Sequence, residues 1–376
     1  MREPAGTRDD VLRFAALNAP LARNQAQAVI DRLQQRSKGL ACELVLLESP
    51  QPEAARAQES FVAASRAEVA FLVKALDEGR TRLLVLEAAD LLAAGLPGVN
   101  IACVPDRAAP FDAFLNRGGL IMDEMEPGAR VGVLSQRVRA QLAALWPDLR
   151  FGILHGGVDR AMETHLRRSE IDGLVLPASV TEHLGIQGIV AEIFAPEFVL
   201  PGPGQGTLVV LAHADDEAAR GLLAPLHSED SAVELAAETA FHRRMLPDQD
   251  LPVAALANVG AEGLVILGAT GAGRQRISVS GTPAEAEAVG DGLAAQILGR
   301  PDTFADLLEA DYHEGREEAA DEDAALLGEL DADAEEVAFD RDLDDLEDLR
   351  GFEDLAGIGD DDGADDHDPD GYDDER

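Results

Sequence analysis

The spacing of apolar residues over positions 11–104 alternates between the periods typical of strands and of helices. Short apolar runs of strand length are separated by segments in which apolar residues recur every three to four positions, as on one face of a helix. The runs predict strands at 11–17, 42–49, 82–88 and 98–105, and the longer segments predict helices at 18–37 and 66–79. This order predicts a mostly parallel sheet with helices on both faces and right-handed connections.

The same alternation begins again in the next part of the chain. It predicts strands at 129–135, 150–156 and 172–178, with helices at 136–147 and 159–170. The run PGPGQG follows at 201–206, where prolines fix the backbone and glycines allow angles closed to other residues. One further strand, 206–213, has no partner in a finished unit, so we expect it to return to the first sheet.

These patterns predict two lobes joined by crossing strands. One lobe comprises 11–104 together with 204–215, and the other comprises 105–203. We expect a cleft between the lobes, with the ends of loops facing it.

The pattern changes after residue 219. A helix at 231–246, three strands of an antiparallel meander at 251–259, 263–270 and 274–281, and a helix at 283–298 predict a small α+β domain over 219–300. The tail, 301–376, is too charged to fold alone and is predicted to be mostly disordered. Within it apolar residues recur at every third position: Leu343, Leu346, Leu349 and Phe352. This segment is either a short amphipathic helix that docks on a protein partner or part of a solubilising tail.

Composition narrows the classes of partner. The formal net charge is −41, and most of it falls in 301–376, where 33 acidic residues face 4 arginines. Neither part of the chain offers the cationic surface that a nucleic acid needs. The two cysteines, Cys42 and Cys103, lie in apolar runs and predict no disulfide. With no signal peptide and no apolar run of membrane-spanning length, a cytoplasmic location is expected.

Three stretches resemble the porphobilinogen deaminase (hydroxymethylbilane synthase) family. LPGPGQGTLVV at 200–210 resembles its glutamine loop and crossover strand, the segment 126–166 resembles its arginine-bearing region, and HSEDSAVELAAETAFHRRM at 227–245 resembles the helix that opens its third domain. The resemblance implies an α/β fold with two doubly wound lobes of the periplasmic-binding-protein type and a small α+β third domain. It implies a transferase that polymerises four porphobilinogen units with release of ammonia, on the way to haem.

The family's site residues carry over by position. The resemblance implies Asp90 as the catalytic carboxylate, because the reaction moves protons on pyrrole nitrogen and on the departing amine. It implies that Ser135, Arg137, Gly156 and Gln205 bind the carboxylates of substrate or cofactor. It also implies a dipyrromethane primer attached through a cysteine thioether in the third domain, and no metal.

Several family positions differ in this chain. Gln249 stands where the family has the primer cysteine. Leu17, Val138, His155 and Ala161 stand where the family has arginines. An amide forms no thioether, and an apolar side chain cannot pair with a carboxylate. The residues therefore predict that the primer is absent and that the polymerising activity is lost. The alternatives are a non-catalytic protein that binds an anion or a pyrrole, and a protein that binds a partner.

Single residues admit more than one interpretation. Asp90 is either an acid in the cleft or the cap of a helix that begins there. Arg137 either clamps an anion or lies on the surface, and Gln205 is expected to brace the crossover rather than touch a ligand. Arg243 and Arg244 are expected to be solvated.

Two further motifs are predicted to have no ligand. LAHADDEAAR resembles a zinc motif with His213, Asp215 and Asp216 as ligands, but its place after a late strand disfavours a metal site. LGATGAGRQR, 267–276, is glycine-rich but precedes a strand and lacks a following Lys-Ser/Thr, which predicts a hairpin turn rather than a phosphate loop.

Overall fold

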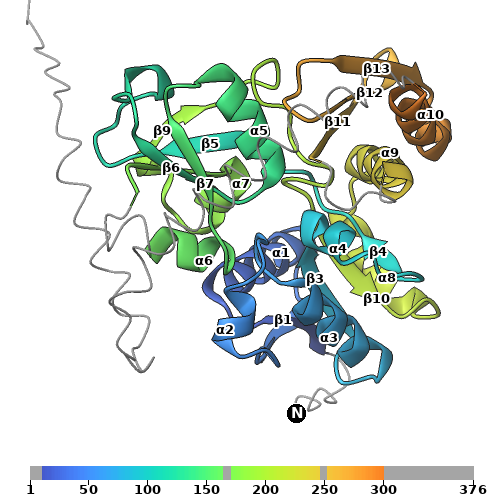
Figure 1. Ribbon diagram of the computed structural model, residues 1–376. Coiled ribbons are helices and arrows are strands. Elements are labelled where there is room, and N and C mark those ends of the chain that lie inside the picture. Colours follow the sequence, from blue (N-terminus) through green and yellow to red (C-terminus); the bar gives the residue numbers. More distant parts are fainter. Residues whose placement is uncertain (1–10, 164–170, 246–251, 300–376) are drawn as a thin grey trace, which may run out of the picture. The chain divides into compact units, whose positions relative to one another are not determined.

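The computed structural model describes residues 11–163, 171–245 and 252–299 (Figure 1). These residues belong to the first of two units into which the chain divides, 1–332 and 333–376. The predicted tail, including the leucine-containing segment, lies outside the described residues.

The first sheet has the strand order β2-β1-β3-β10-β4. Its strands are β1 (Val11–Leu17), β2 (Ala41–Leu47), β3 (Leu83–Glu87), β4 (Ile101–Cys103) and β10 (Leu208–Ala212). Strand β1 is parallel to β2 and to β3, whereas β10 lies antiparallel between β3 and β4. The return of the late strand to the first sheet, predicted from the loop at 201–206, is therefore confirmed.

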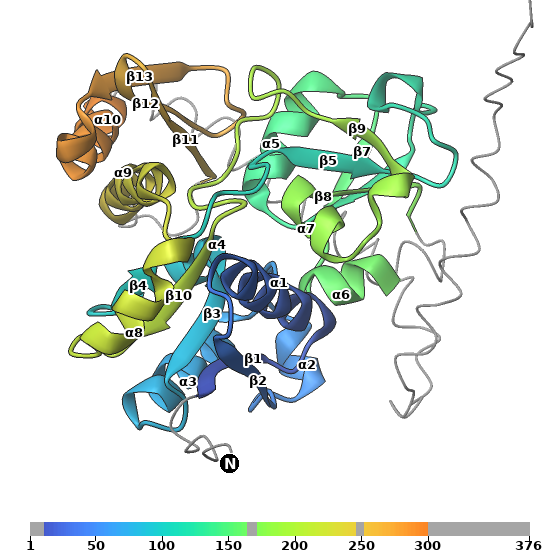
Figure 2. The ribbon, with the colours of Figure 1, turned by 180° about the vertical axis from the view of Figure 1, so that it is seen from behind.

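The second sheet has the order β7-β6-β8-β5-β9 (Figure 2). Its strands are β5 (Asp112–Leu115), β6 (Arg130–Val133), β7 (Arg150–Ile153), β8 (Gly173–Pro177) and β9 (Val190–Ile193). Strand β5 pairs antiparallel with β8 and β9. The chain thus crosses between the lobes twice. It passes from β4 of the first sheet to β5 of the second, and it later returns to the first sheet as β10.

The third sheet is an antiparallel meander, β11-β12-β13, as the sequence predicts. Its strands are β11 (Val253–Gly260), β12 (Gly263–Thr270) and β13 (Arg276–Gly281), and the helices α9 (Glu229–Met245) and α10 (Ala286–Leu298) pack against it. Gly268 allows this packing, because a Cβ there would lie 2.6 Å from a methyl carbon of Leu293 in α10.

The remaining helices join the strands of the two lobes. They are α1 (Pro20–Arg36), α2 (Glu53–Arg56), α3 (Arg66–Asp77), α4 (Ala88–Ala94), α5 (Gln136–Leu145), α6 (Gly157–Met162), α7 (Ala178–His183) and α8 (Glu217–Leu223), with 3-10 turns at Met122–Glu124, Gln187–Ile189, Ala224–Leu226 and Pro283–Glu285. Ser65 begins α3 through a capping box with Glu68, and Gly95 ends α4 in the left-handed conformation.

The run PGPGQG needs its glycines at two positions. Gly204 and Gly206 both have a φ of +76°, which is strained for residues with a Cβ. A Cβ at Gly206 would also lie 3.0 Å from the carbonyl oxygens of Ala108 and Ala109, on the chain that crosses in the opposite direction. The glycines thus let the two crossing segments approach each other closely. We call these segments, 107–112 and 200–206, the crossover.

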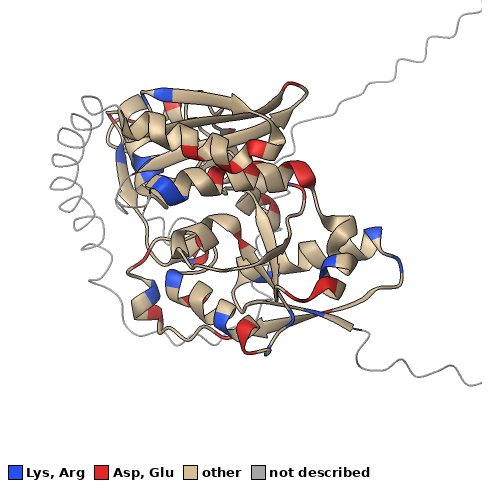
Figure 3. Ribbon diagram, turned by 90° about the vertical axis from the view of Figure 1, so that its right-hand side faces the viewer, with Lys and Arg blue, Asp and Glu red and all other residues tan. Residues whose placement is uncertain are grey.

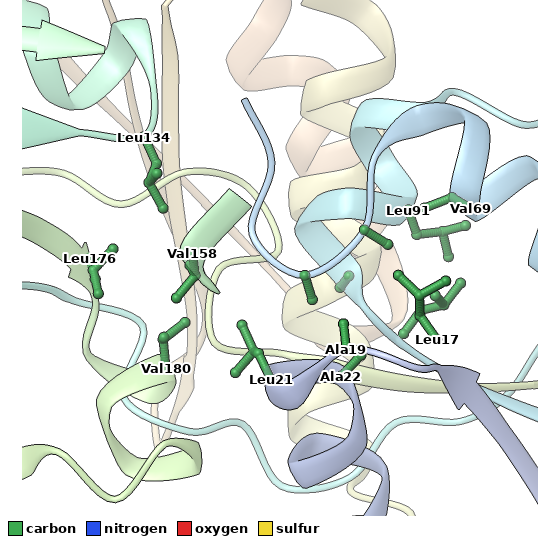
Figure 4. Close-up of a cluster of buried hydrophobic side chains, with 14 of the residues drawn as sticks. Leu17, Ala19, Leu21, Ala22, Val69, Leu91, Leu134, Val158, Leu176 and Val180 are labelled. Atoms are coloured by element: carbon green, nitrogen blue, oxygen red, sulfur yellow. The ribbon is translucent and has the colours of Figure 1, made fainter. Parts of the chain in front are cut away.

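The two lobes meet through one continuous hydrophobic cluster. Leu21 of α1 and Val158 of α6 are both 0% exposed and belong to the same cluster. Figure 4 shows Leu21 directed toward Val158 and Val180 of the other lobe. Apolar side chains from both lobes bury each other there, and the cleft expected from the sequence stays a prediction.

Candidate active site

Asp90 is buried and bound by main-chain amides. Its carboxylate, on a side chain 4% exposed, accepts hydrogen bonds from the amides of Val62 (2.9 Å), Ala63 (2.7 Å) and Ala64 (2.9 Å). The interpretation of Asp90 as a helix cap is wrong, because α4 begins at Ala88 and Asp90 lies within its first turn. The partners of Asp90 come instead from the segment that precedes α3.

A second carboxyl group lies beside Asp90. Burial, together with the neighbouring Asp90, raises the pKa of Glu87 to about 8, while hydrogen bonds from Gly206 and Gln25 oppose the shift. The Gln25 Nε2 donates to Glu87 Oε2 at 2.7 Å, while Glu87 Oε1 has no hydrogen-bond partner. Burial also raises the pKa of Asp90 to about 6. Glu87 is therefore mostly protonated at neutral pH, whereas Asp90 is mostly ionised.

The segment that binds Asp90 also binds the other lobe. The amide of Gly156 donates to the carbonyl of Glu59 (2.9 Å), and the amide of Val158 donates to that of Val62 (3.2 Å). The hydroxyl of Ser60 donates to the carbonyl of Leu154 at 2.9 Å. Residues 59–64, which we call the latch segment, thus bond to both lobes.

The side chain of Phe61 fixes the latch segment in place. Its ring is 8% exposed and lies against Gly157, where a Cβ would overlap the ring. The guanidinium of Arg56 lies over the same ring, 5.4 Å from its centroid, and forms a 2.8 Å ion pair with the buried Glu68.

A carboxylate from the second lobe lies at the start of α1. Asp159 of α6 accepts a hydrogen bond from the amide of Leu21, in the first turn of α1. Burial raises the pKa of Asp159 to about 6, and Arg56 opposes that shift. The contact joins the two lobes at the same apolar cluster that contains Leu21.

Arg137 is buried against the crossover, so the interpretation as a surface arginine is wrong. It is 7% exposed and forms two hydrogen bonds with Asp112, at 2.9 and 3.1 Å. It also donates to the carbonyl of Leu200 (2.8 Å) and to Gln205 Oε1 (2.9 Å). Both terminal nitrogens of the guanidinium therefore have partners within the protein.

Gln205 braces the crossover with both ends of its amide. Besides accepting from Arg137, it donates to the carbonyl of Pro110 (2.8 Å) and to Asp112 Oδ1 (3.1 Å). These contacts support the interpretation of Gln205 as a brace for the two crossing segments.

The sequence did not single out Arg107 and Glu238, which join the crossover to α9. Arg107 donates to Glu238 through two nitrogens, at 2.7 and 3.1 Å, and to the carbonyl of Gln205. Glu238 is 0% exposed and also accepts from the amides of Gly204 (2.6 Å) and Ala257 (2.8 Å). The sequence contains one sign of this contact. Glu238 lies on the apolar face of its helix, three positions before the buried Phe241, where an acidic residue is rarely found unless it is paired.

Ser135 begins α5 and its hydroxyl accepts from the amide of Val138 at 3.3 Å. Gln249 lies outside the described residues, so its prediction is untested. Cys42 lies in β2 and Cys103 in β4, and burial raises the pKa of the Cys103 thiol to about 12.

The side chains of the zinc-like motif have other partners: His213 Nδ1 lies 3.0 Å from Asp215 Oδ1, and Asp216 pairs with Arg82. Asp216 forms two hydrogen bonds with Arg82, which lower its pKa to about 2, and accepts from the amide of Ala219 at the start of α8. Within the described ranges, no group of three side chains suited to a metal is found. LGATGAGRQR, 267–276, forms the turn between β12 and β13, which confirms the predicted hairpin.

Comparison with known proteins decides the family. The model of the porphobilinogen deaminase, dipyromethane cofactor binding domain matches residues 12–221. A porphobilinogen deaminase of Syntrophotalea carbinolica is 32% identical over 296 residues, 77% of this chain and 93% of the relative. The chain belongs to the porphobilinogen deaminase family. Another family member, from Roseiflexus sp., is 36% identical over 228 residues, 60% of this chain and 75% of the relative.

Solved structures give a weaker likeness. The VFT2 domain of Bordetella pertussis BvgS is 17% identical, with a TM-score of 0.35, and the match covers 63% of this chain and 99% of that domain. The assignment to an α/β fold with two sheet-containing lobes rests on the strand orders described above.

The porphobilinogen deaminase motif positions can now be placed in the structure. Leu17, Val138 and Ala161, which stand where the resemblance expects arginines, are at most 3% exposed and belong to hydrophobic clusters. His155 is half-buried, and its Nδ1 lies 3.2 Å from the hydroxyl of Ser60. At these positions the chain has hydrophobic core contacts, or a contact between a histidine and a hydroxyl of the latch segment.

The polar groups around Asp90 are bonded within the chain. The carboxylate of Asp90 and the amides of Gly156 and Val158 are bonded to the latch segment. Figure 3 shows both basic and acidic segments along the described ribbon. No helix among the described residues is long and apolar enough to span a membrane.

Proposed function

We propose that this chain is a tetrapyrrole-lineage protein that keeps the porphobilinogen deaminase fold but carries no dipyrromethane and does not polymerise porphobilinogen. The placement of the two cysteines carries the proposal. Cys42 and Cys103 both lie in the first sheet, and the sequence has no cysteine in 219–300. The family's primer is attached to a cysteine of the third domain, so the primer lacks the sulfur atom to which it could bond.

The loss of buried cations supports the same proposal. Each porphobilinogen unit has two carboxylates, and arginine pairs with such groups through two parallel hydrogen bonds. In this chain Leu17, Val138 and Ala161 occupy arginine positions and are packed in hydrophobic clusters. A hydrogen bond to a charged group contributes about 1.5–3 kcal/mol, so several losses would weaken binding by orders of magnitude.

The charges that remain between the lobes also disfavour an anionic substrate. Asp90 and Asp159 are carboxylates, and both have raised pKa values because burial disfavours their ionised forms. A substrate carboxylate placed beside them would add a further negative charge to a site that stabilises such charge poorly.

Intact mass of the natively purified full chain tests the proposal. We expect the mass of the sequence alone, no colour with Ehrlich reagent and no consumption of porphobilinogen. The porphobilinogen deaminase of Syntrophotalea carbinolica, purified in the same way, is the positive control for all three measurements.

A covalent mass excess together with the colour reaction would overturn the proposal, as would consumption of porphobilinogen. If the excess is found, peptide mapping identifies the residue that carries it. An adduct on Cys42 or Cys103 would show that the primer site has moved into the first lobe.

A further inference from the structure

The latch segment makes the kinds of contact that a ligand held between two lobes would make. On the side of the first lobe its amides, from Val62 to Ala64, donate to the carboxylate of Asp90. On the side of the second lobe its carbonyls at Glu59 and Val62 accept from the amides of Gly156 and Val158. We infer that residues 59–64 act as an internal ligand that latches the two lobes together.

The latch segment is anchored by a side chain as well as by its main chain. The ring of Phe61 lies close to both the guanidinium of Arg56 and the backbone of Gly157. Since Gly157 belongs to the second lobe, the ring contacts Arg56 of α2 in one lobe and Gly157 of α6 in the other. Any side chain at position 157 would push the ring away.

The surrounding hydrophobic cluster makes the two sets of contacts interdependent. Ala63 and Ala64 of the latch segment belong to the same cluster as Leu21 of the first lobe and Val158 of the second. Withdrawal of the segment would leave the carboxylate of Asp90 and the amides of Gly156 and Val158 without these partners in a mostly apolar place. Such unpaired groups are costly, so the segment and the lobe contacts should open together.

The latch has a functional consequence that does not depend on whether the primer is absent. A molecule that uses the carboxylate of Asp90 or the amides of Gly156 and Val158 must first displace residues 59–64. The lobes are thus held closed by the chain itself, and access requires a local opening rather than a preformed site.

Hydrogen exchange of the full-length protein tests the latch. We compare the wild type with Phe61→Ala and with Phe71→Ala as the matched control, since Phe71 of α3 also lies under an arginine, Arg80, at 5.2 Å. In Phe61→Ala we expect exchange to rise at least about tenfold in peptides covering 59–64 and 154–162 together. Exchange in strands β1 and β3 should not change.

Two results would overturn the inference. One is faster exchange at 59–64 while 154–162 stays protected, because the segment would then not link the lobes. The other is an equal rise at 59–64 and 154–162 in Phe71→Ala, because the effect would then reflect a general loss of stability. If Phe61→Ala does not fold, Phe61→Leu keeps an apolar side chain and provides the same comparison. Neither readout involves pyrrole chemistry, so failure of the proposed function would leave the test intact.

Discussion

The crossover and the latch are both buried and both join parts of the protein, but they use different chemistry. The crossover is held by two buried ion pairs, Arg137 with Asp112 and Arg107 with Glu238. At the latch, by contrast, main-chain amides donate to a single carboxylate, Asp90, and apolar side chains fill the space around it. Buried cations thus stabilise the crossover, whereas Leu17 and Ala161 in the inter-lobe cluster are apolar.

The difference gives a physical reason why, under the proposed function, a ligand site can lose its cations while the crossover keeps its own. A buried ion pair with several further hydrogen bonds cannot lose one partner without leaving an unpaired charge. A binding site for an anion has no such internal partner in the absence of its ligand, so apolar residues can replace its cations and gain burial energy. The following predictions test this contrast.

The largest effect is expected at the crossover. Glu238→Ala leaves the guanidinium of Arg107 and the amides of Gly204 and Ala257 without their acceptor. We expect the free energy of unfolding to fall by about 3–5 kcal/mol, as for other broken buried pairs. Denaturant unfolding measures the change. Glu229→Ala on the same helix is the control, because the Glu229 side chain is 86% exposed and should change stability by less than about 0.5 kcal/mol.

A comparable loss in Glu229→Ala would contradict the view that burial of the ion pair matters. Such a loss would show that substitution of an exposed residue of α9 destabilises the protein as much as loss of the buried ion pair. If Glu238→Ala were as stable as the wild type, the contrast between crossover and latch would lose its basis.

The next largest effect concerns pH. The folded-state pKa of Glu87, about 8, lies above the ordinary value of 4.5, so the folded state binds this proton more tightly. Its stabilising contribution is complete below about pH 4.5 and is lost as the pH rises through 8. Asp90 raises this pKa, while Gly206, Gln25 and Arg107 oppose the shift. One pKa unit corresponds to about 1.4 kcal/mol, so Glu87→Gln should exceed the wild type in stability by a few kcal/mol at pH 9.

Thermal unfolding between pH 5 and pH 9 measures this effect. The gap between Glu87→Gln and the wild type should widen as the pH rises. Asp216→Asn is the control of opposite sign, since Arg82 lowers the pKa of Asp216 to about 2. Its offset from the wild type should stay constant over this range. A constant offset for Glu87→Gln would show that Glu87 is ionised throughout.

Much of the fold could be predicted from the sequence because its repeating units are local. The strands at 11–17 and 42–49, the meander and the returning strand all follow from periodicity and from one distinctive loop. Short elements such as β9 (Val190–Ile193) and α7 (Ala178–His183) were missed, because four to six residues contain too little of either period.

Candidate residues such as Asp90 could be named from the sequence, but the groups that they contact could not. Asp90 was identified, yet its amides come from residues 26 to 28 positions earlier in the chain. Arg137 and Gln205 are 68 positions apart, and Arg107 and Glu238 are 131 apart. Such pairs follow from the tertiary fold, and no local pattern reveals which buried cation meets which carboxylate.

A moderate effect is expected at the latch. In Gly157→Ala the new Cβ overlaps the ring of Phe61, and the backbone φ of +82° is strained for alanine. We expect a loss of about 2–3 kcal/mol in unfolding free energy, combining strain and overpacking. Gly185→Ala is the control, because its φ is +67° but no atom lies within 4 Å of the new Cβ. It should lose only the strain, about 1 kcal/mol.

The double variant Gly157→Ala with Phe61→Ala isolates the contact between the two residues. Because the smaller side chain at 61 removes the overlap, the double variant should be more stable than the sum of the single changes predicts. Additive losses would mean that the ring does not lie against Gly157.

The smallest effect is expected at Ser135, which begins the helix that carries Arg137. In Ser135→Ala the amide of Val138 loses an acceptor at 3.3 Å, a long hydrogen bond. We expect a loss of about 0.5–1 kcal/mol, and only a few tenths in Ser135→Gly, since glycine is tolerated at this position of a helix. Chemical denaturation with both variants measures the two losses. A loss above about 2 kcal/mol in Ser135→Ala would indicate that the start of α5 stabilises the crossover as strongly as the buried charges do. The difference between the crossover and the latch would then not be one of ion pairs alone.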